Sequence, residues 1–352
     1  MALLLTYLES RNRLKNGMKL GFALVTLLGV IHYNYGNDYM AYYDIYKSIV
    51  NVPFNFSNVI GGYVYKEPGW ALINYAFKPI GGFFMMVAVL NIIQNVIYYR
   101  FIKNNVARSW WPVAIFIYLF SSNFYLLNFS MMRQGLVIAV FLAMWKYIKA
   151  KKWHIALVGL ILAASVHSSA LILLPFSFWG FLKMKNGKVW AIIYLVLFFF
   201  LWSADDLLNV VFEALIIFEA FQAFSYYLTD AESVEFGVGF LINMLPFVVS
   251  IYYLMIDKEQ TEQNHQLVAL ATIGFMILPF GQIIPLISRV GMYFGAFSIC
   301  AFTDSYSIIR NRYMRWIMIG IYVAITLYDY WNFFNNSVYA DSYYHFKTIF
   351  TA

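Results

Sequence analysis

Long apolar blocks separated by short polar or basic segments run through the whole 352-residue chain. A helix needs about 20 apolar residues to cross the hydrocarbon core of a bilayer, and most of these blocks approach that length. The pattern therefore predicts an all-α, polytopic integral membrane protein, with a single membrane domain over residues 1–352 and about nine full spans. The predicted spans are residues 19–33, 81–99, 110–127, 129–148, 189–202, 238–256, 267–287, 290–309 and 316–334.

The basic residues between the apolar blocks predict how the spans are oriented. Lys and Arg gather on the cytoplasmic side of membrane proteins. Arg11 and Lys15 precede the first span, Lys103 follows the second, and Lys149 follows the fourth. This arrangement places the N-terminus in the cytoplasm and predicts large outer loops at about residues 34–78 and 203–237. Helical spacing of apolar residues from Leu207 to Phe221 suggests an interfacial helix within the second loop.

Residues 155–182 break the charge pattern if they cross the membrane once. The later basic loops obey the positive-inside rule only if this segment enters the membrane and turns back at residues 166–169. Each arm then has about 12–14 residues, enough for half a bilayer. The sequence therefore predicts a re-entrant helical pair. Its turn must be buried in protein or face a wet cavity, because lipid cannot satisfy irregular backbone.

Composition excludes several classes of protein. The chain is 62% hydrophobic and only 12% charged, too few charges to cover the surface of a soluble domain. The net charge of +7 is attributed to cytoplasmic Lys and Arg, so nucleic-acid binding is not expected. The lone cysteine, Cys300, excludes an intrachain disulfide, and no metal-ligand cluster or nucleotide motif is present. No cofactor is predicted. The aromatic share of 21% is a weak indication of a glycan ligand, beside lipid-facing and core packing.

Charged residues inside apolar spans are costly and therefore mark candidate functional positions. Arg133 stands at the outer start of a span and His167 at the proposed turn. Arg133 precedes Lys149 by 16 residues (149 − 133), and His167 follows Lys152 by 15 (167 − 152). At about 1.5 Å per residue, both lie about 22–24 Å above the inner end of neighbouring helices. Arg133, Gln134 and His167 are therefore expected to converge near the outer face.

Other candidates lie in the predicted outer loops and at one more span. Asp38 follows a Gly-Asn pair, Glu67 precedes Pro-Gly-Trp, and Tyr42 belongs to a row of tyrosines on one helical face. Arg289 begins a span, with Tyr293 one turn later. Two arginines suit a diphosphate, and a histidine or carboxylate can act as general base. The alternatives are interfacial arginines, a core histidine and solvated carboxylates.

Several short motifs occur together in a fixed order between about residues 30 and 295. They are Gly36-Asn37-Asp38-x3-Tyr42, Glu67-Pro68-Gly69, Asn128-x4-Arg133-Gln134, Ala164-x2-His167-x-Ser169-Ala170 and Ser288-Arg289-x3-Tyr293-Phe294. Together these motifs resemble those of the EpsG/Wzy-type polysaccharide polymerases. Relatives often carry an arginine shortly before the first motif, where this chain has His32 and Tyr33.

The resemblance implies a GT-C-like, metal-independent glycosyltransferase in the bacterial cytoplasmic membrane, with its active site facing outside. Such an enzyme joins oligosaccharide repeat units held on undecaprenyl diphosphate, which is the leaving group. It implies membrane lipid, a flippase and a chain-length co-polymerase as partners. The implied product is a surface polysaccharide of the O-antigen, capsule or exopolysaccharide type. Two rival functions stay open: a lipid-linked glycan flippase or transporter, and a membrane acyltransferase that uses His167.

The same resemblance assigns roles to the candidate residues. Arg133 and Arg289 are expected to neutralise the leaving diphosphate. His167 is expected to deprotonate the acceptor hydroxyl or bind the diphosphate, with two carboxylates as competing bases. The remaining side chains are expected to bind and orient substrate. The competing bases are Asp38 and Glu67, and the substrate-binding residues are Gln134, Tyr293, Tyr42 and His32.

Overall fold

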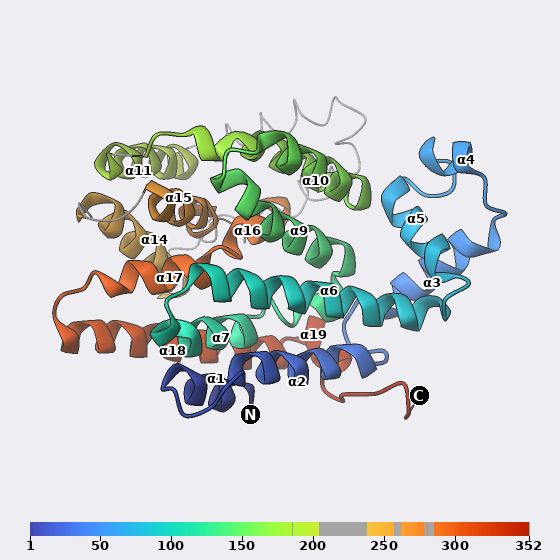
Figure 1. Ribbon diagram of the computed structural model, residues 1–352, viewed down its shortest axis with the longest axis horizontal. Coiled ribbons are helices and arrows are strands. Elements are labelled where there is room, and N and C mark those ends of the chain that lie inside the picture. The colour runs from blue at the N-terminus through green and yellow to red at the C-terminus, as the bar shows by residue number, and fades with distance from the viewer. Residues whose placement is uncertain (185, 204–237, 257–261, 278–279, 281–284, 352) are drawn as a thin grey trace. The chain divides into compact units, whose positions relative to one another are not determined.

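The computed structural model describes residues 1–184, 186–203, 238–256, 262–277, 280 and 285–351. Apart from one isolated bridge between His32 and Thr348, the regular structure in this part of the chain is helical (Figure 1). The all-α prediction is thus confirmed. The chain divides into two compact units, Met1–Gly180 with Ile317–Ala352, and Phe181–Trp316. The single membrane domain stays a prediction.

In the first unit, four helices pack in a row, each against the next. Helix α2 packs against α6, α6 against α9, and α9 against α10, and these helices run side by side in Figure 1. Its elements are α1 (Ala2–Ser10), α2 (Gly17–Ile31), α3 (Tyr39–Asn51), α4 (Phe56–Ile60), α5 (Pro68–Phe77), α6 (Gly82–Asn105), η1 (Arg108–Trp110), α7 (Trp111–Phe120), α8 (Leu127–Ser130), α9 (Met132–Lys149), α10 (Trp153–Val166), η2 (Ser168–Phe181), α18 (Arg312–Asn335) and α19 (Ser337–Tyr343).

In the part of the chain that the structure describes, two helices are long and apolar enough to cross a bilayer by themselves, α6 and α18. Shorter apolar helices, α2 and α10 among them, coincide with other predicted apolar blocks. These helices indicate a membrane protein, while the number of spans and their orientation stay predictions. One block is shorter than expected: α7 ends at Phe120, because the polar run Ser121-Ser122-Asn123 forms a turn before α8.

The predicted reversal after α10 is confirmed. Helix α10 ends at Val166, and His167 is extended, with φ −148° and ψ 112°. The 3₁₀ helix η2 then leads back. The rings of Trp153, at the start of α10, and Phe178, near the end of η2, stack with centroids 5.1 Å apart. Chain segments on either side of His167 therefore form a hairpin, with His167 at its tip. Its depth in a membrane stays a prediction.

The predicted outer loop at residues 34–78 contains three helices, α3, α4 and α5. Tyr39, Tyr42 and Tyr46 are buried on one face of α3, as their spacing predicts. Helix α5 begins with Pro68, whose fixed φ and missing N–H suit the first helical position. Glu67 is therefore held at the N-cap of α5. The loop forms packed structure that fixes where its polar residues lie.

The second unit contains α11 (Gly187–Ser203), α14 (Val238–Ile256), α15 (Glu262–Ile277), α16 (Pro285–Gly295) and α17 (Ser298–Ser307). The prediction placed a turn at residues 288–289, but α16 runs through it. Pro285 begins this helix. The helix ends at Gly295 instead, and α17 begins at Ser298. The predicted loop at 203–237 and its interfacial helix lie outside the described residues, except for Ser203, which ends α11.

Candidate functional site

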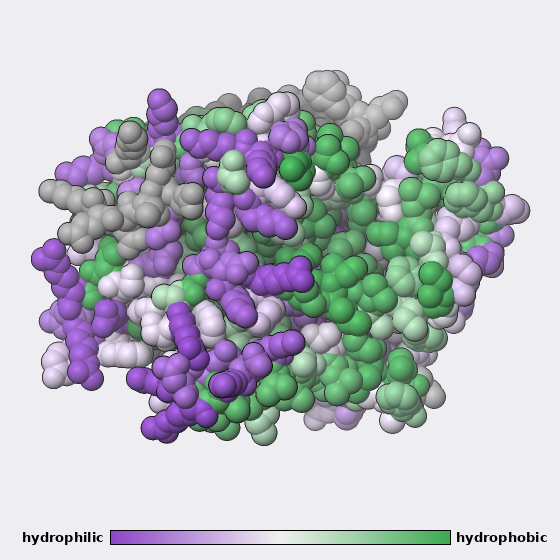
Figure 2. Space-filling model, in the orientation of Figure 1, coloured by the Kyte–Doolittle hydropathy of each residue, from purple (hydrophilic) through white to green (hydrophobic). Residues whose placement is uncertain are grey.

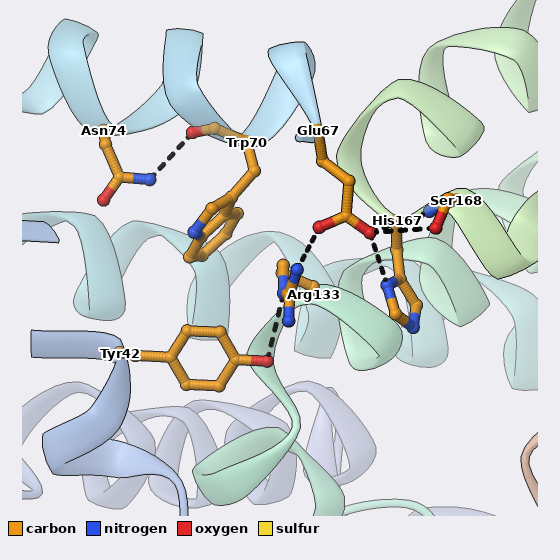
Figure 3. Close-up of polar contacts among 7 residues, drawn as sticks. All are labelled: Tyr42, Glu67, Trp70, Asn74, Arg133, His167 and Ser168. Carbon is orange, nitrogen blue, oxygen red and sulfur yellow. Dashed lines mark hydrogen bonds and ion pairs between the residues drawn. The ribbon is translucent and has the colours of Figure 1, made fainter. Parts of the chain in front are cut away.

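A buried carboxylate joins three segments of the first unit that are far apart in sequence (Figure 3). Glu67 comes from the N-cap of α5, Arg133 from the first turn of α9, and His167 from the tip of the hairpin. The Glu67 side chain is only 2% exposed, whereas those of Arg133 and His167 are 16% and 15% exposed. The carboxylate is therefore enclosed, and its two basic partners retain some access.

Both oxygens of the Glu67 carboxylate accept hydrogen bonds. Oε2 accepts from Nη1 of Arg133 in an ion pair. Oε1 accepts from Nδ1 of His167 at 3.0 Å, from the backbone N–H of Ser168 at 2.9 Å and from its hydroxyl at 3.2 Å. Four donors thus converge on one carboxylate, which stabilises its ionised form.

These donors set the protonation state of Glu67. Burial by itself raises the pKa of the carboxyl. The hydrogen bond from His167, the charge of Arg133 and the N–H of Ser168 together outweigh burial and lower the pKa to about 2. Glu67 is therefore ionised at neutral pH, and it can only accept hydrogen bonds. A carboxylate with so low a pKa is a poor proton acceptor.

The ionised Glu67 in turn selects the tautomer of His167. Because an ionised carboxylate has no proton to donate, Nδ1 of His167 must carry the hydrogen in their bond. In the neutral imidazole, Nε2 then has a free lone pair. Among the described residues Nε2 has no hydrogen-bond partner, and it is not among the enclosed polar atoms. This nitrogen can accept a proton from a bound substrate.

Aromatic rings hold the other side of Arg133. Its guanidinium carbon lies 5.5 Å from the ring centroid of Tyr42 and 5.6 Å from that of Tyr65. Its Nε donates to the Tyr42 hydroxyl at a long 3.4 Å. Cation–π contacts of this kind stabilise a partly desolvated charge. Trp70 packs edge-on against Tyr42 with centroids 5.5 Å apart, so α5 also positions this ring.

Two glycines allow the segments of the site to approach closely. A Cβ on Gly69 would lie 2.2 Å from the Ser165 hydroxyl oxygen and 2.9 Å from its backbone carbon, so α5 meets the end of α10 there. Gly36 has φ +115°, and a Cβ on it would lie 2.5 Å from the carbonyl oxygen of Phe129. Side chains at these positions would push α5 and the start of α3 away from the site.

Comparison with known protein families supplies an independent result: residues 19–348 match the EpsG family. The chain belongs to the EpsG family. The match includes all three segments that meet at Glu67, and membership indicates a role in exopolysaccharide synthesis. No curated protein and no solved structure matches the chain.

In this EpsG-family protein, four of the predicted site residues lie together: Tyr42, Glu67, Arg133 and His167. Asp38 is half-buried one helical turn before Tyr42, and its backbone N–H donates to the hydroxyl of Ser130 at 3.2 Å. Its carboxylate makes no hydrogen bond or ion pair with the other four residues. Its role as a competing base stays a prediction.

The other predicted site residues occupy different surroundings. His32 is only 1% exposed, its Nδ1 lies 2.7 Å from the carbonyl oxygen of Gly29, and its ring packs against aromatic side chains. Gln134 is buried on α9 next to Arg133. Arg289 and Tyr293 lie on α16 in the second unit, Tyr293 fully buried. Substrate binding by these four residues stays a prediction.

The sequence analysis did not select two residues that contribute to the site, Tyr65 and Ser168. Tyr65 stands two positions before Glu67 among loop residues with no periodic pattern, so nothing in the sequence marks it. Ser168 follows His167 directly after the end of α10, and a serine beside a helix end is a signal for a contact of its backbone N–H and hydroxyl with an anion. No group of three His, Cys, Asp or Glu within the described part of the chain is arranged to hold a metal. Metal independence stays a prediction.

Proposed function

We propose that this EpsG-family protein is a glycosyltransferase that polymerises an exopolysaccharide from undecaprenyl-diphosphate-linked repeat units at the outer face of the membrane. The observation that carries the proposal is the Glu67 carboxylate, which holds a cation and a histidine of defined tautomer side by side. A diphosphate leaving group needs a cation, and an attacking hydroxyl needs a proton acceptor. Family membership supports the substrate class.

In the proposed reaction, a hydroxyl oxygen of the acceptor unit attacks the anomeric carbon of the donor unit. The new glycosidic bond forms as the bond from that carbon to undecaprenyl diphosphate breaks. The hydroxyl proton passes to Nε2 of His167, and the electron pair leaves with the diphosphate. Arg133 stabilises the growing negative charge. The glycosyl diphosphate supplies the driving force, so no nucleotide or further reactant is required.

Glu67 acts in this proposal as a positioning residue. It was a candidate base on sequence grounds, but four donors and a pKa of about 2 suit it poorly to that role. Its charge instead keeps the proton on Nδ1 of His167 and anchors the guanidinium of Arg133. A carboxylate that orients a histidine in this way also stabilises the imidazolium formed after proton transfer.

Polymerisation by the purified protein tests the proposal. Protein in detergent is incubated with undecaprenyl-diphosphate-linked repeat units from the source cells, without nucleotide, and the products are separated as a ladder. His167→Gln keeps an amide that can donate to Glu67 but removes the base, and should slow polymerisation by about 10²–10⁴-fold. Arg133→Lys keeps the charge but loses the planar fork, and should also reduce the ladder strongly. The matched control is Lys66→Gln, which removes an exposed cation beside Glu67.

A wild-type ladder that persists in His167→Gln would refute the proposed base. Asp38→Asn is then the next variant, because Asp38 is the other predicted carboxylate. Absence of any ladder, together with movement of the lipid-linked units across proteoliposome membranes, would favour the transporter function instead. Loss of the ladder in the Lys66→Gln control as well would show that polymerisation depends on the total positive charge near the site and not on Arg133 and His167 in particular.

A further inference from the structure

A groove separate from the Glu67 cluster lies between α2 and α6 in the first unit. Its cavity volume is 530 Å³, within the range of about 300–1,000 Å³ typical of sites for small organic ligands. The wall is mainly apolar, and its apolar side chains include Phe22, Leu27, Val30, Ile92 and Val96. In Figure 2, hydrophobic side chains cover the face over the end of α2 and the start of α6. A hydrocarbon chain would pack well against this apolar wall.

The polar side chains in the wall are already hydrogen-bonded within the protein. The Thr26 hydroxyl donates to the carbonyl oxygen of Phe22 at 2.7 Å. The Asn95 amide donates to the carbonyl oxygen of Asn91 at 2.9 Å and accepts from the Tyr118 hydroxyl at 2.8 Å. Because these groups are satisfied, the middle of the groove offers little to a sugar or another polar ligand. A chain of CH₂ groups needs no such partners.

The only charged side chains that line the groove are two cations, Lys19 and Arg100. Lys19 is near the start of α2, and Arg100 is near the end of α6. Both are exposed, and neither side chain makes an ion pair or hydrogen bond to another part of the described chain. Hydrophilic side chains gather around these ends of α2 and α6 in Figure 2. The groove thus combines an apolar wall with an unneutralised positive end, the pattern that an anionic amphiphile complements.

The length of the groove indicates a single lipid chain. From Lys19 to Val30 the lining extends over 11 residue steps of α2 (30 − 19), or about 16 Å at 1.5 Å per residue. One leaflet of a bilayer contributes about 15 Å to a hydrocarbon core of about 30 Å. The positive-inside rule assigns the cationic end to the cytoplasmic leaflet. The groove therefore matches one acyl chain of a lipid whose head group lies at the cytoplasmic surface.

We infer that the groove between α2 and α6 binds an anionic glycerophospholipid of the cytoplasmic leaflet, with its phosphate between Lys19 and Arg100 and one acyl chain along the apolar wall. The site is distinct from the Glu67 cluster and does not depend on the proposed polymerase reaction. It uses the opposite end of α2 and α6 from the predicted outer loop, so the lipid is not the glycosyl donor.

Native mass spectrometry of the purified protein tests this site. Phosphatidylglycerol and phosphatidylethanolamine with the same acyl chains are added to wild type and to the double variant Lys19→Gln/Arg100→Gln. Each cation near a membrane surface contributes about five-fold to anionic-lipid preference, so the double variant should lose about 30-fold. The matched control is Arg13→Gln/Lys15→Gln, which removes two charges from the same predicted side without touching the groove. It should retain the wild-type preference.

A second measurement does not depend on the charges. Ala23→Trp places a large ring in the groove from an exposed position of α2 and should abolish labelling by phosphatidylglycerol with a photoreactive acyl chain. In wild type, the labelled peptides should come from α2 and α6. Equal binding of both phospholipids, unchanged preference in Lys19→Gln/Arg100→Gln, or an equal loss in the control would overturn the inference. So would a long-chain prenyl phosphate that displaces phosphatidylglycerol from these peptides.

Discussion

Replacing Glu67 with glutamine should destabilise the protein at neutral pH, and this effect should vanish as the pH falls. Glutamine has nearly the same shape, so the change removes the charge with little loss of packing. It leaves the half-buried guanidinium of Arg133 without its counter-charge. It also sets an amide N–H against at least one of the donors that now converge on the carboxylate.

The magnitude follows from the pKa of Glu67. Its fall from an ordinary 4.5 to about 2 in the folded protein corresponds to about 3 kcal/mol of stabilisation. Because the folded pKa is the lower one, the contribution is fully present above about pH 4.5. It is lost as the pH falls from there towards 2. Breaking a buried ion pair by removing one partner costs about 3–5 kcal/mol, which is consistent with this value.

Thermal unfolding in detergent, followed by the fluorescence of the ten tryptophans, measures the effect. Wild type should unfold at a higher temperature than Glu67→Gln at pH 7, and the gap should narrow to about half or less at pH 3. Asp44→Asn is the control, since Asp44 is an exposed carboxylate on α3. It should show no gap at either pH. A gap between wild type and Glu67→Gln that is independent of pH, or no gap at pH 7, would refute the assigned ionisation of Glu67.

Two further substitutions test how the site is assembled. Gly69→Ala forces a methyl group against the Ser165 backbone, so it should cost about 1–3 kcal/mol in unfolding experiments and lower polymer yield. Gly320→Ala on α18, where the added methyl meets no neighbour within 4 Å, is its control and should be neutral or stabilising. Tyr42→Phe removes the 3.4 Å bond to Arg133 but keeps the ring contact, so rates should fall less than about ten-fold, whereas Tyr42→Ala should cost more.

The meeting of Arg133 and His167 could be predicted because it depends on simple helix geometry. Both residues stand a similar number of residues from the short turn that joins two antiparallel helices, and 1.5 Å per residue brings them to one level. The break at His167 could also be predicted, since a single crossing would have reversed the charge pattern of every later loop. In the first case the constant rise of a helix determined the arrangement, and in the second the distribution of basic residues between the spans.

The central place of Glu67 could not be predicted in the same way. It lies in a loop whose fold depends on tyrosine packing in α3 and on the contact of Gly69 with Ser165. Spacing along the sequence places the tyrosines on one helical face, but it does not encode what that face packs against or that Gly69 meets Ser165. Sequence analysis selected Glu67 for its type of side chain and regarded it as a base. Its four donors come from segments 66 to 101 residues away, so only tertiary structure reveals that its oxygens are occupied.

A single carboxylate that serves two partners makes the site dependent on all three segments at once. If α5 shifts, Arg133 loses its counter-charge and His167 loses the acceptor that selects its tautomer. Neither loss can be repaired by α9 or the hairpin alone, because no second carboxylate of the described residues pairs with either side chain. A site assembled in this way is already oriented before substrate arrives, so little reorganisation is needed during the reaction. On this argument, substitutions at Glu67 should lower the rate through both Arg133 and His167, and the double variant with His167→Gln should lose clearly less than the sum of the two single losses.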